Sequence, residues 1–219
     1  MCVFDRIAGF LIGAQVAYIA MLAFLVAAAV ASGSVFGAGA SVGLMIGAIL
    51  SLAVCTGLFI AALADLNNCQ GPCSSTLNDV RSQLTAMIVV LAIVLVMLIA
   101  LAIVAPVPVA GAVAITPAVF WLTTGAAVLI TIDGCLSVAL AMAFSKFNDC
   151  QASNSQPSNS ALVTVFGILS GIAFAGSLVV GLNGGLLWSL LALLITATAL
   201  GWSWSVTVDQ GDQGSGKGG

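Results

Sequence analysis

The sequence contains no histidine and no glutamate, and only 5% of its 219 residues are charged. Without histidine, the chain has no imidazole to act as a general base near neutral pH or to bind haem, copper or zinc. The formal net charge is −3, and no basic cluster is present that would neutralise the phosphates of a nucleic acid. We therefore expect a protein that is not an enzyme, that holds no cofactor or metal, and that binds no nucleic acid.

Apolar residues are abundant instead. Hydrophobic residues make up 62% of the chain, and the mean hydropathy is +1.26. A soluble domain carries roughly a quarter charged residues, whereas this chain has four basic and seven acidic side chains to cover its whole surface. The composition predicts an integral membrane protein whose main partner is the lipid bilayer.

Six long apolar runs predict six transmembrane helices, because a helix needs about 20 apolar residues to cross about 30 Å of hydrocarbon. None shows the two-residue alternation of a barrel strand. The predicted fold is an all-α, polytopic membrane protein, with a six-helix transmembrane domain over residues 1–206 built as three consecutive helical hairpins, and a flexible polar tail over residues 207–219. The runs cover residues 7–31, 42–64, 84–105, 118–144, 161–182 and 186–206.

The first apolar run resembles a signal peptide in two respects. Arg6 precedes it, and Ala29-Val30-Ala31 has the form of a cleavage site. Its length of about 25 residues exceeds the 7–15 apolar residues of a signal peptide, so we expect it to be retained as the first helix.

Nearly all charged residues fall on one side of the predicted topology. The termini and the connections at residues 65–83 and 145–160 share one side of a six-span chain, while the connections at residues 32–41, 106–117 and 183–185 carry no charge. The charged side holds Asp5, Arg6, Asp65, Asp79, Arg81, Lys146, Asp149, Asp209, Asp212 and Lys217.

The basic residues and the polar composition of the charged connections favour opposite orientations in the membrane. All Lys and Arg residues lie on the charged side, so the positive-inside rule favours a cytoplasmic location for both termini. The two charged connections are also rich in Ser, Asn, Gln and Cys, a composition typical of external loops with disulfides. We favour the cytoplasmic orientation on the charge rule.

A repeated pattern supports the hairpin arrangement. Cys55 precedes Asn68-Cys69-Gln70 by about four helical turns, as Cys135 precedes Asp149-Cys150-Gln151. The pattern predicts pseudo-repeats over about residues 1–80, 81–155 and 156–206. Chance similarity within a low-complexity apolar chain is the alternative explanation.

Asp133 is the one ionisable residue inside a predicted span other than cysteine and tyrosine. A charged carboxylate there is costly, so such residues are functional candidates by default. We expect Asp133 to be protonated and to donate a hydrogen bond, with Ser137 one turn later and Gln15 in the first span as candidate partners. Asp133 is then either a proton or cation site in a permeation path or a polar clamp between helices.

The six cysteines fall into two groups. Two lie within spans, at Cys55 and Cys135, where small apolar packing is the simplest role. The other four form a candidate disulfide or thiol cluster on the charged side. A Gly-Pro turn can bring two of these, Cys69 and Cys73, together as a disulfide if that side is oxidising, and otherwise the four remain thiols or acyl acceptors. The cluster comprises Cys2, Cys69, Cys73 and Cys150.

Three glycine pairs with a four-residue spacing lie in the spans. Such pairs let helices approach closely in lipid, and we expect them to act in packing within one chain more than in dimerisation. The pairs are Gly9 with Gly13, Gly43 with Gly47, and Gly167 with Gly171.

The connections on the uncharged side are apolar as well as uncharged, notably residues 33–40 and 106–117. Apolar surface outside a fold marks contact sites. The function we expect first is therefore that of a structural or accessory subunit of a larger membrane assembly, with other membrane subunits or further copies of the chain as partners. The alternative is a small channel or transporter with Asp133 as its proton or cation site.

Overall fold

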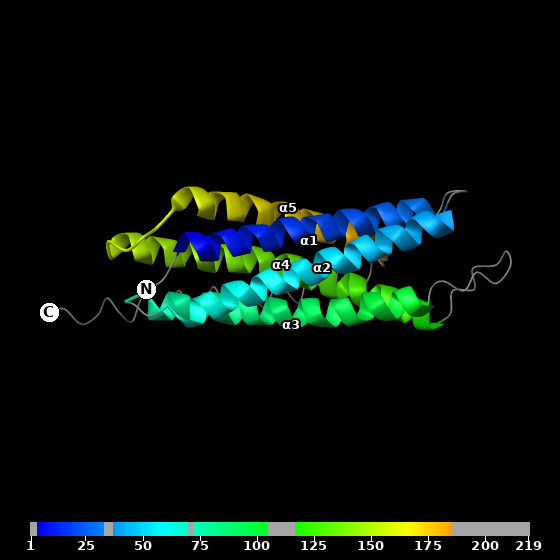
Figure 1. The fold of residues 1–219 in the computed structure, drawn as a ribbon, viewed down its shortest axis with the longest axis horizontal. Coiled ribbons are helices and arrows are strands. Elements are labelled where there is room, and N and C mark those ends of the chain that lie inside the picture. Colours follow the sequence, from blue (N-terminus) through cyan, green and yellow to red (C-terminus); the bar gives the residue numbers. More distant parts are fainter. Residues whose placement is uncertain (1–3, 33–36, 70–71, 105–116, 185–219) are drawn as a thin grey trace.

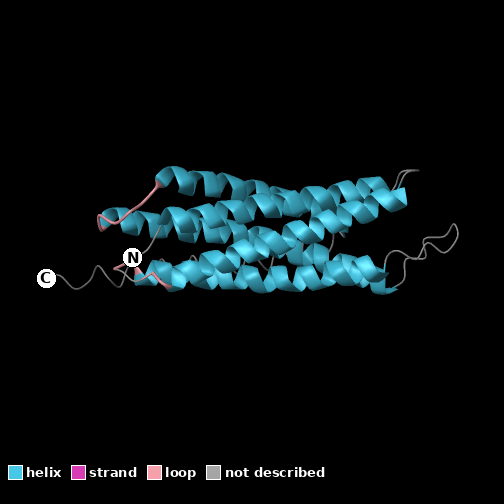
Figure 2. Ribbon diagram, in the orientation of Figure 1, coloured by secondary structure: helices cyan, strands magenta, loops and turns pink. Residues whose placement is uncertain are grey.

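The computed structural model of the protein describes residues 4–32, 37–69, 72–104 and 117–184. This part of the chain contains five α-helices and no strand (Figures 1 and 2). Each helix is long and apolar enough to cross a membrane, which indicates an integral membrane protein. The helices are α1 Phe4–Ser32, α2 Gly37–Asn67, α3 Ser74–Val104, α4 Pro117–Ser153 and α5 Ser160–Gly184.

The predicted all-helical membrane fold is confirmed for the described residues, and the first five predicted spans coincide with α1 to α5. The sixth predicted span, residues 186–206, lies outside the described residues, as do the tail, Cys2 and most of the apolar connections between α1 and α2 and between α3 and α4. The six-span hairpin arrangement and the internal repeat therefore stay predictions.

The helices extend further than the apolar runs predicted. Most of the connections expected at residues 65–83 and 145–160 are helical, since α3 begins at Ser74 and α4 continues to Ser153. With 37 residues, α4 is about 55 Å long, against about 30 Å of hydrocarbon. Polar residues end the apolar run but do not by themselves end a helix. The helix α4 ends in the turn that contains Ser155, whose φ is 54°. Asn159 then caps the start of α5 by accepting a hydrogen bond from the Leu162 amide.

The helices form a closed ring in which each packs on its neighbours in the chain. The helix α1 packs on α2, α2 on α3, α3 on α4 and α4 on α5, and α5 returns to pack on α1. Helices α1 and α4 therefore face each other across the interior of the ring, and only long side chains join them. The ring fixes which residues point inward, and so it determines what the interior can hold.

An aromatic cluster fills the interior at one end of the ring. Phe4 of α1 stacks on Phe144 of α4 with ring centroids 5.1 Å apart, and Phe144 makes an edge contact with Phe166 of α5 at 5.7 Å. All three rings are buried. On the outside, α3 exposes large aliphatic side chains such as Val96 and Ile103, as expected for a surface that faces lipid.

The same end, which we call the charged end, carries every described Asp, Lys and Arg except Asp133. An ion pair joins Arg6 to Asp65 at 3.0 Å, and the Arg81 guanidinium donates hydrogen bonds to the carbonyls of Leu66 and Cys69. These contacts tie α1 to α2 and α2 to α3 where the helices leave the apolar layer.

A disulfide between Cys73 and Cys150 links the start of α3 to the last turns of α4, with Cα atoms 6.0 Å apart. Cys69 is disulfide-bonded as well. The turn expected to pair Cys69 with Cys73 is therefore not closed by a disulfide between them. The reason is topological: α3 and α4 are neighbours in the ring, and their polar ends meet at the charged end.

Candidate functional site

Polar side chains occupy the interior of the ring around the middle of α4. Gln15, Thr131, Asp133, Ser137 and Ser177 are completely inaccessible to solvent. They come from α1, α4 and α5. A buried polar group in a membrane protein costs free energy unless it is hydrogen-bonded, so the partners of these groups determine their role.

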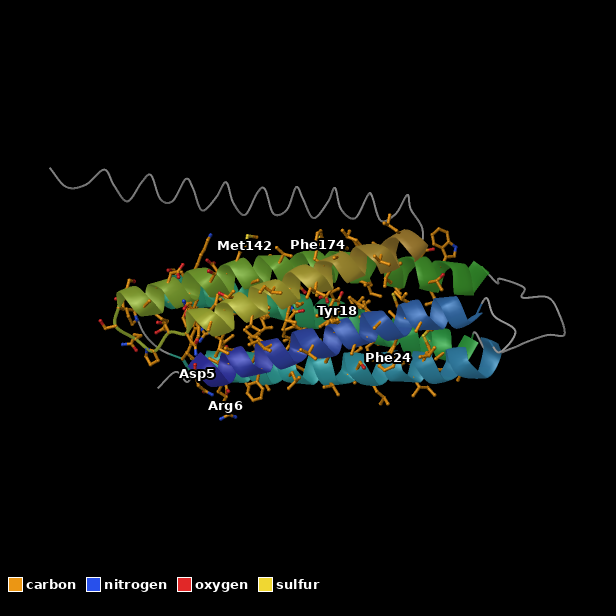
Figure 3. The ribbon with its side chains drawn as sticks, turned by 90° about the horizontal axis from the view of Figure 1, so that it is seen from above. Asp5, Arg6, Tyr18, Phe24, Met142 and Phe174 are labelled. Atoms are coloured by element: carbon orange, nitrogen blue, oxygen red, sulfur yellow. A yellow bond between two sulfur atoms is a disulfide. The ribbon has the colours of Figure 1, made fainter. Side chains whose placement is uncertain are left out.

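The one tyrosine of the sequence, Tyr18, spans the interior from α1 to α4. Its hydroxyl donates a hydrogen bond to the Ile130 carbonyl at 3.0 Å, and its side chain is completely buried. Tyr18 lies near the middle of the bundle's length (Figure 3). The hydroxyl uses its hydrogen in the bond to Ile130. The lone pairs of its oxygen can therefore accept a hydrogen bond from a second group.

Two contacts fix the register between α1 and α4. Phe4 meets Phe144, and Tyr18 meets Ile130. Both pairs fit one antiparallel register, in which each step forward along α1 matches one step backward along α4. The same register places Gln15 opposite Asp133.

The carboxyl of Asp133 is the centre of this polar region. It lies close to Tyr18 of α1 and to Cys55 of α2. Ser137 lies one helical turn from it on the same face of α4. The structure thus brings the three residues singled out from the sequence, Asp133, Gln15 and Ser137, into the interior of the ring beside Tyr18.

The Tyr18 hydroxyl lies beside the Asp133 carboxyl but donates its hydrogen bond to the Ile130 carbonyl, and within the described part of the chain Asp133, Gln15 and Ser137 make no hydrogen bonds to one another. Both oxygens of Asp133, both amide atoms of Gln15 and the Ser137 hydroxyl are buried without a partner there. The expected hydrogen bonds between them are therefore not formed in this structure, although the register places the groups at neighbouring levels. We call Asp133, Gln15, Ser137 and Tyr18 the interior polar site.

The interior polar site supplies oxygen ligands and one acid. Carboxyl, amide and hydroxyl oxygens suit a proton or a hard cation, and a single carboxylate balances a single positive charge. Among the described residues, no group of three His, Cys, Asp or Glu side chains is placed to hold a metal ion. The arrangement therefore suits a proton or a monovalent cation better than a divalent metal.

Close helix contact beside Asp133 depends on Gly134. A Cβ atom built at this position would overlap the Ser177 hydroxyl oxygen of α5 and would lie 2.7 Å from the Ser177 Cβ and 3.3 Å from the Phe174 Cα. The Ser177 hydroxyl is itself held by a hydrogen bond that it donates to the Phe174 carbonyl at 2.8 Å. Gly134 thus lets α5 close the ring against the interior polar site.

The glycine pairs noted in the sequence are placed differently from Gly134. A Cβ atom at Gly13 would meet Leu58 at 3.3 Å, and one at Gly47 would meet the ring of Phe24 at 3.2 Å. The other four have open space, with nothing within 4 Å of a built Cβ: Gly9, Gly43, Gly167 and Gly171.

Sequence reasoning missed Tyr18, Gly134 and Ser177. Tyr18 carried a signal, because it is the one tyrosine of the chain and lies one turn after Gln15 on the same helical face. Gly134 and Ser177 belong to no recurring pattern, and their contact follows from the packing of α4 on α5. The cysteines of the spans, Cys55 and Cys135, are buried thiols.

The chain matches no protein-family model, no curated protein and no solved structure.

We predict that Gly134→Ala destabilises the protein, because the added methyl forces α4 and α5 apart. Overpacking of this kind typically costs about 1–3 kcal/mol. Thermal unfolding in detergent measures the effect, and Gly9→Ala is the matched control because a Cβ atom at Gly9 meets nothing within 4 Å. Adding Ser177→Gly should restore much of the loss. Equal unfolding midpoints for Gly134→Ala and Gly9→Ala would contradict the contact between Gly134 and Ser177.

Proposed function

We propose that the protein binds a proton or a monovalent cation at Asp133, within the membrane, as a small channel or transporter. The observation that carries the proposal is the juxtaposition of Asp133, Gln15 and Ser137, which are fully buried with unpartnered polar atoms at neighbouring levels of the ring. The proposal involves no chemical reaction, and so it describes a protein that is not an enzyme.

The energetics of burial support a ligand-binding role. Each buried polar group without a hydrogen bond costs about 1–3 kcal/mol, and an unpaired carboxylate costs more. A proton on Asp133 removes its charge and creates a donor for Tyr18 or Gln15. A monovalent cation would balance the charge and take several of the unpartnered oxygens as ligands. A purely structural clamp would instead be expected to have its hydrogen bonds in place.

The helices must move before a proton or cation at Asp133 can exchange with the solution on either side of the membrane. Asp133 is completely buried, and the aromatic cluster of Phe4, Phe144 and Phe166 lies between it and the charged end. A transporter reaches a central site by alternating between conformations that open to different sides. The contacts described between α1 and α4 each involve at least one side chain, so these two helices can separate without breaking a backbone-to-backbone interface.

We expect Asp133→Asn to abolish proton or cation flux into liposomes that contain the purified protein. The asparagine amide neither binds and releases a proton nor carries a negative charge that would balance a cation. The matched control is Asp79→Asn, which removes an exposed carboxylate at the charged end and should leave the flux unchanged. If the unaltered protein shows no flux, or if Asp133→Asn transports as well as it does, the transport proposal fails. Thermal unfolding in sodium chloride and in choline chloride separates the ligands, since only a sodium site would be stabilised by sodium.

We propose as a second candidate that the protein is a structural or accessory subunit of a larger membrane assembly. The observation that favours this function is the charged end, where α3 and α4 extend beyond the apolar layer and are joined by the Cys73–Cys150 disulfide. A rigid projection of this kind suits contact with another subunit. The apolar connections that first suggested such contacts, residues 33–40 and 106–117, are mostly outside the described residues.

Purification in mild detergent tests this second candidate. An assembly subunit should elute with other membrane proteins or as a defined oligomer, and removal of the disulfide by Cys73→Ser with Cys150→Ser should weaken that association. Ser74→Ala, a change at the neighbouring exposed position, serves as the control. A monodisperse monomer without partners would count against an assembly role.

We further propose that residues 186–206 form a sixth span and that both termini therefore lie on one side. The charge rule favours the cytoplasm for that side, whereas disulfides at the charged end favour an oxidising compartment. A bias of four basic residues is weak, and a reducing cytoplasm would keep Cys73 and Cys150 as thiols, so we favour the oxidising side for the charged end.

Labelling of the exposed Lys146 by an impermeant amine reagent in intact cells tests this orientation. Protection of Lys146 until the cells are opened would instead place it in the cytoplasm.

A further inference from the structure

A groove of about 360 Å³ runs between α4 and α5 on the outside of the ring. It lies toward the charged end, and Met142 marks its α4 side in Figure 3. Its α5 side is formed largely by small or hydroxyl-bearing residues, and its α4 side by aliphatic residues and Ser145. The small and hydroxyl-bearing residues of the groove include Ser145, Thr164, Gly167, Ser170 and Gly171.

Two features of the groove indicate that a helix covers it. Gly167 and Gly171 are exposed, and a Cβ atom at either would meet nothing within 4 Å, so these glycines serve no contact among the described helices. Ser170 is 99% buried, lines the groove, and has a hydroxyl oxygen without a hydrogen-bond partner in the described residues. Lipid tails offer no hydrogen bond, whereas a neighbouring helix offers both hydroxyl groups and close backbone contact.

We propose that the groove between α4 and α5 is the docking site of residues 186–206 of the same chain, the predicted sixth span. This segment follows directly on α5, which ends at Gly184. Its 21 residues carry no charge, and as a helix they would be about 31 Å long, enough to cross the membrane. In this proposal the chain turns back at Gly184 and Gly185, which lays the segment antiparallel along α5.

The small residues of the two segments match in height. Gly171 and Gly167 lie 13 and 17 residues before Gly184, and Ala197 and Gly201 lie 13 and 17 residues after it. In an antiparallel helical hairpin, equal distances from the turn bring residues to the same level. Thr196 and Thr198 flank Ala197 and provide hydroxyls at the level of Ser170. This match between α5 and residues 186–206 does not involve Asp133, so it does not depend on whether Asp133 binds a cation.

Cysteine cross-linking in native membranes tests the docking. In a background with Cys55→Ala and Cys135→Ala, we expect Gly171→Cys with Ala197→Cys to form a disulfide within one chain, as should Gly167→Cys with Gly201→Cys. A disulfide requires Cβ atoms about 4 Å apart, so only facing positions react efficiently. Mass spectrometry of the digested protein identifies the linked peptides. Gly167→Cys and Gly171→Cys do not clash with the described helices, because a Cβ atom at either position meets nothing within 4 Å there.

The matched control replaces Ile172, which neighbours Gly171 at the same height but is exposed on another face of α5. Ile172→Cys with Ala197→Cys should cross-link several-fold less. Equal yields from Ile172→Cys and Gly171→Cys, or no cross-link in either glycine pair, would overturn the proposal. A covalent dimer formed by Gly171→Cys alone would also overturn it, because it would place a second copy in the groove.

Discussion

The hydrogen bond from Tyr18 to the Ile130 carbonyl joins α1 to α4, two helices that are not neighbours in the ring of the described structure. The closed ring leaves α1 and α4 on opposite sides of its interior, so a long side chain with a polar tip is needed to bridge them. This bridge, together with the contact of Phe4 with Phe144, fixes the register. The register in turn places Gln15 opposite Asp133, and the functional proposal depends on that placement.

Gly134 and Ser177 add a second constraint beside Asp133. Because Gly134 has no side chain, α5 packs closely on α4 beside the interior polar site. The Asp133 carboxyl is completely buried there, and Gln15 and Ser137 have polar atoms without a partner in the described part of the chain. The interior polar site and the ring closure are thus two consequences of one packing arrangement.

Composition and apolar run length were sufficient to predict five of the helices, because a run such as residues 84–105 has no other stable form in lipid. The ends of α3 and α4 were not predictable in this way, since Ser, Asn and Asp continue a helix when tertiary contacts hold it. Asp133, Gln15 and Ser137 were identified from chemistry alone. Their relation to Tyr18, and the pairing of Cys73 with Cys150, depend on which helices are neighbours in the ring, and hydropathy contains no information on that order.

The central claim is that Asp133 carries a proton or a cation that exchanges. Infrared spectroscopy of the protein in lipid tests it directly, because a protonated carboxyl absorbs apart from a carboxylate and the other described aspartates lie at the charged end. We expect a protonated-carboxyl band that Asp133→Asn removes and that changes with external pH or with sodium. A band that Asp133→Asn leaves in place, or one that no change of pH or cation alters, would contradict an exchangeable proton or cation at Asp133.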